Sequence, residues 1–321
     1  MNIHIFEQLR QQEFITDADL EIIREKEKKK AFSLHWELKT LLYLGIVLLT
    51  TGLGILIYKN IDTIGHQVIV AIIALGCAAC FGYCLKKSPG FSRQKNMATK
   101  IWPDYILLLG CLLLLILIAY LQFQYNVFGN HYGLATFIPM VLLFISAYYF
   151  DHIGVLSMAI TNLAAWAGIT VTPLHILKDN DFNNSAIIYT GVALGVGLLA
   201  VAHISILKNI KSHFAFTYKN FGAHGLLISC LAGLFTINYL WFLLLAGVCA
   251  YLFINAIREK SFYFFVITLL YAYIGISYMV MQLLTKIGDI GSIYLGLFYF
   301  ILSGIFLIRV MMSYNKQFNK Q

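Results

Sequence analysis

Apolar runs long enough to cross a bilayer constrain this chain more than any other feature. A membrane-spanning helix needs about 20 consecutive apolar residues. Only 12% of the 321 residues are charged, about half the share that is usual in a soluble domain, so most of the surface must face lipid. The sequence therefore predicts an all-α, polytopic transmembrane helix bundle of about ten spans, near residues 41–58, 68–85, 105–123, 132–150, 153–177, 186–207, 221–237, 239–257, 263–284 and 290–312.

The positions of the basic residues predict the orientation of these spans. Loops on the cytoplasmic side of a membrane protein are enriched in Lys and Arg. With the N-terminus inside, 20 of the 23 basic residues fall on cytoplasmic segments or the adjoining span ends, and the exceptions are Lys59, Lys178 and Lys286. We expect a multi-pass protein of the cytoplasmic (inner) membrane with both termini in the cytoplasm. The same distribution explains the net charge of +8, so the bilayer, and no nucleic acid, is the expected partner.

Three parts are predicted along the chain. Residues 1–40 form a cytoplasmic N-terminal helical segment, in which Thr16 is a plausible N-cap of a second short helix. Residues 41–312 form the transmembrane helix bundle, and 313–321 form a cytoplasmic tail. Ten spans divide into five and five, which is compatible with an inverted repeat. The alternative is ten helices without internal symmetry.

Polar side chains inside or beside the spans are the candidate cavity-lining residues. The stretch LQFQYNVFG at the predicted outer end of the third span carries Gln122, Tyr125 and Asn126, which share one helical face if the helix continues. The fifth span adds Asn162 near mid-depth, followed by Trp166 and Thr170. Such residues either line a cavity or bond to a neighbouring helix as packing contacts. Both interpretations stay open from the sequence.

Pro173, near the end of the fifth span, has two interpretations as well. It either breaks the helix, so that freed carbonyl groups line a cavity, or it marks the outer end of the span. No Asp or Glu lies at mid-depth in a predicted span, which argues against a proton relay built on a buried carboxylate.

Glycines at close helical spacing are the candidate helix-packing residues, because they let two backbones approach each other. They are Gly52 and Gly54 in the first span, and Gly191, Gly195 and Gly197 in the sixth.

Three cysteines, Cys77, Cys80 and Cys84, share one face of the second span. They could bind a soft metal, but we interpret them as small hydrophobic residues in a packed seam. We therefore expect no metal and no cofactor. The chain has no nucleophile-elbow or His-Glu-x-x-His motif, and we expect no enzymatic activity.

Three parts of the chain are similar to a known family: the segment LRQQEFITDADLEIIREKEK, the glycine-rich first span ending at Asn60 and Ile61, and the run Tyr125, Asn126 and Gly129 after the third span. In these parts the chain resembles a bacterial family of predicted membrane proteins, domain of unknown function 2157 (DUF2157). The family often has Trp where this chain has Ile61. The likeness covers roughly residues 1–170 and implies architecture and location without a mechanism.

Two functions follow as hypotheses. The first is a permease-like protein for a neutral or lipid-like solute. The alternative is a non-transport membrane sensor or assembly factor, which contacts a protein partner through its N-terminal cytoplasmic helices. An intramembrane enzyme is the least favoured class.

Overall fold

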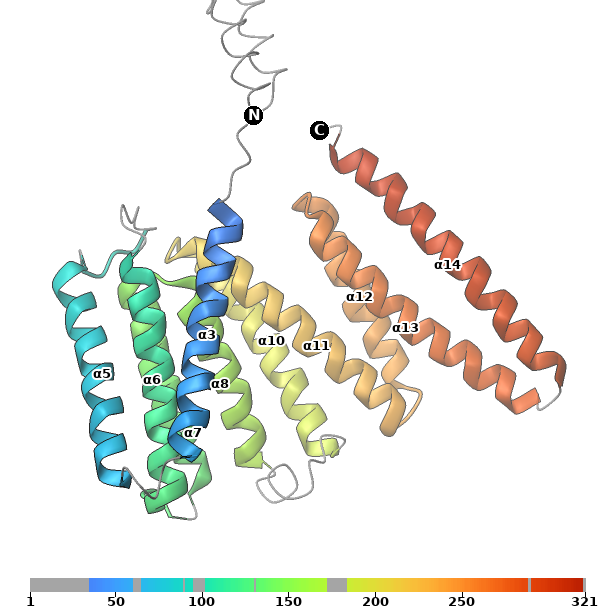
Figure 1. Ribbon diagram of the computed structural model, residues 1–321. Coiled ribbons are helices and arrows are strands. Elements are labelled where there is room, and N and C mark those ends of the chain that lie inside the picture. The colour runs from blue at the N-terminus through green and yellow to red at the C-terminus, as the bar shows by residue number, and fades with distance from the viewer. Residues whose placement is uncertain are drawn as a thin grey trace, which may run out of the picture. The chain divides into compact units, whose positions relative to one another are not determined.

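The computed structural model describes residues 35–59, 65–88, 90–94, 102–129, 131–171, 184–287 and 290–319. Within these residues the protein has ten α-helices and no strand (Figure 1). The predicted all-α bundle is therefore confirmed. The short N-terminal helices predicted before residue 35, and the predicted role of Pro173, lie outside the described residues and stay predictions.

Each predicted span falls on one helix. The helices are α3 (His35–Lys59), α5 (His66–Lys87), α6 (Trp102–Tyr125), α7 (Tyr132–Phe150), α8 (Ile153–Val171), α10 (Ser185–Leu207), α11 (Ala215–Thr236), α12 (Trp241–Arg258), α13 (Phe262–Ile287) and α14 (Ile290–Asn319), with a short 3-10 helix at Ser212–Phe214 before α11. The last helix continues beyond residue 312 into the predicted tail. Nine of the ten helices are long and apolar enough to cross a membrane.

The chain divides into two compact units, Met1–His66 and Gln67–Gln321. In the first unit the structure describes α3, whose threonines bond within the helix. The Thr50 hydroxyl donates to the carbonyls of Ile46 and Val47, at 3.0 and 2.9 Å. Such back-bonding satisfies polar groups without an external partner, so α3 is suited to an apolar surrounding.

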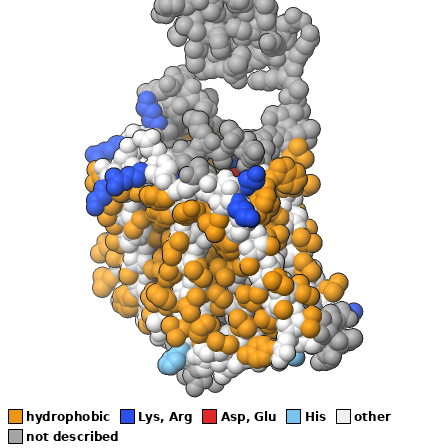
Figure 2. Space-filling view, turned by 90° about the vertical axis from the view of Figure 1, so that its left-hand side faces the viewer, with side chains coloured by type: hydrophobic (Ala, Val, Ile, Leu, Met, Phe, Trp, Pro, Cys, Tyr) orange, Lys and Arg blue, Asp and Glu red, His pale blue; other side chains and the backbone are white. Residues whose placement is uncertain are grey.

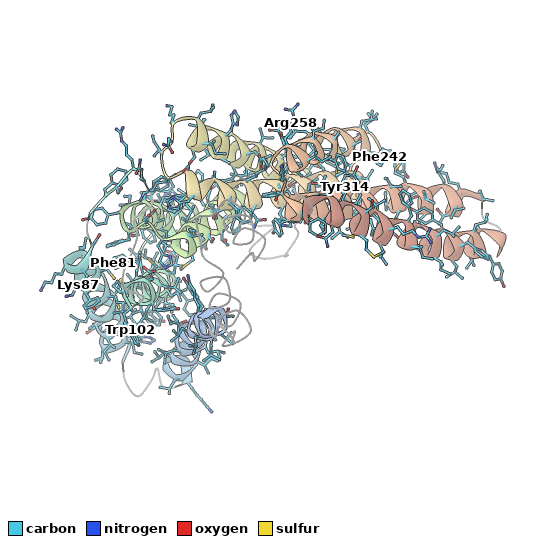
Figure 3. All side chains as sticks on the ribbon, turned by 90° about the horizontal axis from the view of Figure 1, so that it is seen from above. Phe81, Lys87, Trp102, Phe242, Arg258 and Tyr314 are labelled. Atoms are coloured by element: carbon cyan, nitrogen blue, oxygen red, sulfur yellow. The ribbon has the colours of Figure 1, made fainter. Side chains whose placement is uncertain are left out.

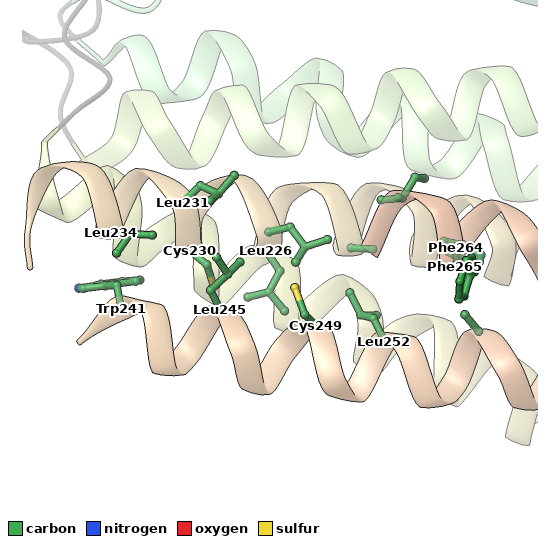
Figure 4. Packing of buried hydrophobic residues seen from close by; sticks show 14 of the residues in the cluster. Leu226, Cys230, Leu231, Leu234, Trp241, Leu245, Cys249, Leu252, Phe264 and Phe265 are labelled. Atoms are coloured by element: carbon green, nitrogen blue, oxygen red, sulfur yellow. The ribbon is translucent and has the colours of Figure 1, made fainter. Parts of the chain in front are cut away.

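In the second unit α11 is the central helix. It contacts α8, α10, α12 and α13, and 12 of its 22 residues are buried. Figure 4 shows Leu234 of α11 beside Trp241 of α12, and Cys230 of α11 beside Leu245 of α12. A second hydrophobic cluster joins α5, α6, α7 and α8 to α10 and the start of α11.

The helix α11 is also the one that hydropathy does not identify as a span. Its first turn, AFTY, is followed by the segment KNFGAHG at residues 219–225, and a continuous apolar run begins only at Leu226. Neighbouring helices cover this segment: Gly222 and Ala223 are buried. A helix shielded by protein faces little lipid, so it needs less apolar surface than a peripheral helix.

Several predicted cytoplasmic segments lie together at one end of the second unit, which is called the basic end below. The Lys211 amide donates to the Arg93 carbonyl at 2.8 Å, and His213 bonds to Asp151 at 2.7 Å. The Lys219 ammonium pairs with Glu259. These contacts join the connections after α5, α7, α10 and α12.

The C-terminal part of α14 also lies at the basic end, because the Tyr314 ring packs on Phe265 with 4.6 Å between centroids. Lys and Arg side chains gather at this end in Figure 2, while hydrophobic side chains cover the flank of the helices. Figure 3 looks down on the basic end, with Lys87 and Arg258 labelled. At the opposite end, Lys286 lies 5.6 Å from the centre of the Tyr239 ring.

Candidate functional site

A cleft of about 680 Å³ lies between α6, α7 and α8. It extends from the turn after α6, at the end opposite the basic end, to the midpoint of α8. The wall residues that the structure describes are apolar or neutral and polar, and none of them is charged: Leu115, Ala119, Gln122, Phe123, Asn126, Tyr132, Ala135, Thr136, Pro139 and Asn162.

Three of the six residues that the sequence marks as candidate cavity-lining residues lie in this wall. They are Gln122, Asn126 and Asn162. Because Asn162 is some 40 positions from the other two, only the packing of α6 against α8 brings them to one cleft. Tyr125, Trp166 and Thr170 are not part of the wall.

The side chain of Gln122 stabilises the turn that ends α6. The helix ends at Tyr125, and Asn126 has a positive φ of 48°, so the helical face does not continue through Asn126. The Gln122 side-chain amide donates to Asn126 Oδ1 and to the Gly129 carbonyl, both at 3.0 Å, and its oxygen accepts from the Phe128 amide at 2.9 Å. Asn tolerates the left-handed conformation better than most residues, so this polar cluster is first of all a helix stop.

Asn162 differs from Gln122 because its amide makes no hydrogen bond to any residue that the structure describes. It is half-buried and lies at the midpoint of α8. An unpaired amide in an apolar medium costs several kcal/mol at the upper end of measured scales, on the order of 2–7 kcal/mol. Asn162 therefore presents a free donor and a free acceptor to the cleft.

Pro139 is a site residue that the sequence reading missed. It lies inside α7, is buried and lines the cleft. A proline cannot donate to the carbonyl four residues earlier, so the carbonyl of Ala135, another wall residue, lacks its helical donor. The signal was in the sequence, as a proline within the apolar run FIPMVLLF.

The remaining candidates pack beside the cleft. The Trp166 ring lies 5.4 Å from that of Phe137 between centroids, and the Thr170 hydroxyl donates to the Trp166 carbonyl at 2.7 Å. A Cβ atom at Gly133 would lie 3.3 Å from the Thr170 hydroxyl. These residues hold the ends of α7 and α8 together, and Tyr125 is exposed at the end of α6.

The candidate packing glycines divide into two groups. A Cβ atom at Gly191 would lie 2.2 Å from Ser229 Oγ, and one at Gly195 would lie 2.7 Å from the Leu226 backbone nitrogen. Both glycines thus face α11. No described atom lies within 4 Å of the corresponding position at Gly197, and the same holds for Gly52 and Gly54 in α3.

The cysteines of α5 face α6. The thiol of Cys77 donates to the Gly110 carbonyl and that of Cys84 to the Pro103 carbonyl, both at 3.6 Å. A Cβ atom at Gly110 would lie 2.9 Å from the Cys80 Cβ. This arrangement is a helix–helix seam. In the described part of the chain, no three His, Cys, Asp or Glu side chains form a group that could hold a metal ion.

A family model described as predicted membrane protein (DUF2157) matches part of this sequence. Residues 7–156 match DUF2157. The family resemblance of the sequence is thereby confirmed over these residues, which include α3, α5, α6, α7 and the start of α8. The DUF2157 match covers the cleft wall from Leu115 to Pro139 and ends before Asn162. Comparisons with curated proteins and with solved structures gave no match.

Proposed function

We propose that this multi-pass membrane protein is permease-like and takes a neutral or lipid-like solute into the cleft between α6, α7 and α8. The observation that carries the proposal is the unpaired amide of Asn162, halfway along a helix of membrane-spanning length and in the wall of a cleft whose described residues are all uncharged. Polar groups inside a bilayer are costly, and they commonly mark a substrate pathway.

The chemistry of the wall supports a solute that is uncharged and amphipathic. An ion would leave water without meeting an opposite charge among the described wall residues, and that desolvation is unfavourable. A hydroxyl or amide group of the solute can bond to Asn162, while an acyl chain lies along Leu115, Ala119 and Phe123. No step of this proposal requires a catalytic residue.

The basic end supports the orientation that goes with this function. If Lys and Arg mark the cytoplasmic side, the C-terminus is cytoplasmic and the cleft opens toward the outside of the inner membrane. The N-terminus is then also cytoplasmic, because ten spans return the chain to the side on which it started.

The function is tested with the purified protein in liposomes and a fluorescent monoacylglycerol that carries a nitrobenzoxadiazole group. Dithionite added outside quenches only the outer leaflet, so it reports movement of the probe across the bilayer. We expect Asn162→Ala to slow this movement about fivefold, since one hydrogen bond is worth about 1 kcal/mol and about 1.4 kcal/mol changes a rate tenfold.

Thr161→Ala is the matched control for this experiment. Thr161 precedes Asn162 on α8, but its side chain is exposed and, among the residues that the structure describes, bonds only to the Ser157 carbonyl. The control should move the probe at the wild-type rate. Equal rates for wild-type liposomes and protein-free liposomes would refute the proposal.

The alternative, a sensor or assembly factor, makes a different prediction for the N-terminal segment. In that case deletion of residues 1–36 abolishes function and leaves the membrane part folded. A permease whose pathway lies between α6 and α8 keeps its probe movement after the same deletion. The two hypotheses are thus separated by one truncated variant in the liposome assay.

A further inference from the structure

A buried ion cluster at the basic end has no role in the cleft. The Lys211 ammonium lies 2.8 Å from Asp151 Oδ1, and His213 Nε2 lies 2.7 Å from the same oxygen. The side chain of Lys211 is 0% exposed and that of Asp151 is 3% exposed. Such burial is unusual, because Lys and Asp are almost never fully buried unless they are paired.

The cluster joins two helix connections that are far apart in the sequence. Asp151 is the left-handed residue that ends α7, with φ 61°, and it precedes α8. Lys211 lies between α10 and α11 and is also left-handed, with φ 49°. The ion pair therefore ties the α7–α8 hairpin to the connection between α10 and α11.

Backbone and hydroxyl bonds hold the Lys211 segment in place. Its amide donates to the Arg93 carbonyl at 2.8 Å. The Ser205 hydroxyl donates to the carbonyl of Ile210 at 2.7 Å and to that of Lys211 at 3.2 Å. Three connections of the chain thus meet at one buried cation.

Aromatic side chains lie beside the cluster. The rings of Phe91 and Phe214 lie 5.7 and 6.0 Å from the Lys211 ammonium, and the hydroxyls of Tyr148 and Tyr218 are 2.9 Å apart nearby, on α7 and α11. Separating such a pair without water leaves two unsolvated charges. Opening of the contact therefore requires water to reach both charges.

The cluster and the cleft are at opposite ends of the same two helices, α7 and α8. We propose that Asp151, Lys211 and His213 form the closed inner gate of the permease pathway. The inference rests on the function proposed above. The structure then represents a state with the cleft open on one side and the gate closed on the other. Movement of the α7–α8 hairpin away from α10 would open the gate and close the cleft, as alternating access requires.

The gate is tested by hydrogen–deuterium exchange of the full chain in nanodiscs, read by mass spectrometry over residues 205–214. The amides of Ile210, Lys211 and Phe214 are all hydrogen-bonded in the closed gate. We expect Asp151→Asn to accelerate their exchange about tenfold or more, because local opening sets the exchange rate of such amides. The same variant should reduce photolabelling of the cleft by a diazirine-bearing monoacylglycerol several-fold.

Glu259→Gln is the matched control. It removes a carboxylate from the basic end whose ion pair with Lys219 is exposed, with Glu259 at 50%. It should change neither the exchange of residues 205–214 nor the labelling of the cleft.

A measurement on the wild-type chain avoids any folding defect of the variant. If cleft and gate are coupled, a ligand that favours the open cleft must also favour the closed gate. Saturating monoacylglycerol should therefore slow exchange at residues 205–214. If Asp151→Asn accelerates exchange at residues 205–214 but leaves labelling of the cleft at the wild-type level, the cluster only stabilises the fold and is not a gate. Exchange at residues 205–214 that is unchanged by saturating monoacylglycerol would also overturn the gate. Absence of cleft labelling in the wild type would overturn the proposed function itself, and the gate with it.

Discussion

At the scale of single residues, Gly195 sets the distance between two helices. A Cβ atom at this position would lie 2.7 Å from the backbone nitrogen of Leu226 on α11. Across the contact, a Cβ atom at Gly222 would lie 3.0 Å from the Gly195 carbonyl. The backbones of α10 and α11 meet directly there, which is how small residues promote helix association in membranes.

Gly195→Ala should therefore destabilise the protein by about 1–3 kcal/mol, since an added methyl group must push a backbone aside. Thermal unfolding in detergent micelles measures the effect as a lower midpoint. Gly197→Ala on the same helix is the control, because no described atom lies within 4 Å of its Cβ position, and it should leave the midpoint unchanged or raise it slightly. Equal midpoints for the two variants would contradict the close contact.

At the scale of elements, α11 shows that hydropathy alone is an incomplete test for a span. Its polar start includes Asn220, whose side chain accepts a hydrogen bond from the Tyr263 hydroxyl at 2.8 Å. His224, one turn further, bonds to the Tyr271 hydroxyl at 3.0 Å. Partners on α13 thus satisfy polar groups that lipid would not, so a helix of mixed composition can lie at the centre of the bundle.

We expect α11 to cross the membrane completely. Lys219 and Asn238 flank the apolar part of the helix, and each is replaced by cysteine in a separate variant. An impermeant maleimide should label one of the two cysteines in intact cells and the other in inverted vesicles. The native thiols do not interfere, because the labelled peptide is identified by mass spectrometry. Labelling of both positions from one side would show that α11 does not span.

At the scale of the whole molecule, basic residues are concentrated at one end of the helices. In the unit Gln67–Gln321 the basic end contains the connections that carry Arg93, Lys208 and Lys260, together with the last turns of α14. The opposite end carries the turn after α6 and the connection between α11 and α12. The positive-inside rule then predicts which end is cytoplasmic.

A green fluorescent protein fused after Gln321 should fluoresce, because it folds in the cytoplasm, and alkaline phosphatase fused there should be inactive. The same phosphatase inserted after Val127, in the turn between α6 and α7, should be active. The reverse pattern would invert the orientation and place the cleft opening in the cytoplasm.

The sequence was sufficient to predict the positions of the helices. Apolar length and flanking turns are local properties, so ten predicted spans match ten helices, including α11, whose polar first turns reduce its mean hydropathy. The signal that ends α6 is also local in the sequence, because Asn126 and Gly129 form the turn that follows the helix. The segment before residue 35 and the possible inverted repeat remain predictions.

Only the tertiary structure decided which side chains meet. From the sequence, Asn162, Trp166 and Thr170 were equally good candidates for lining a cavity. The rotation of α8 against α6 and α7 places only Asn162 of these three in the cleft wall. Likewise Asp151 and Lys211 look like ordinary solvated loop charges in the sequence, yet they are buried together. The physical reason is the same in both cases. Hydrophobicity fixes where a helix lies in the bilayer, whereas its rotation and its partners depend on close packing between segments distant in the chain.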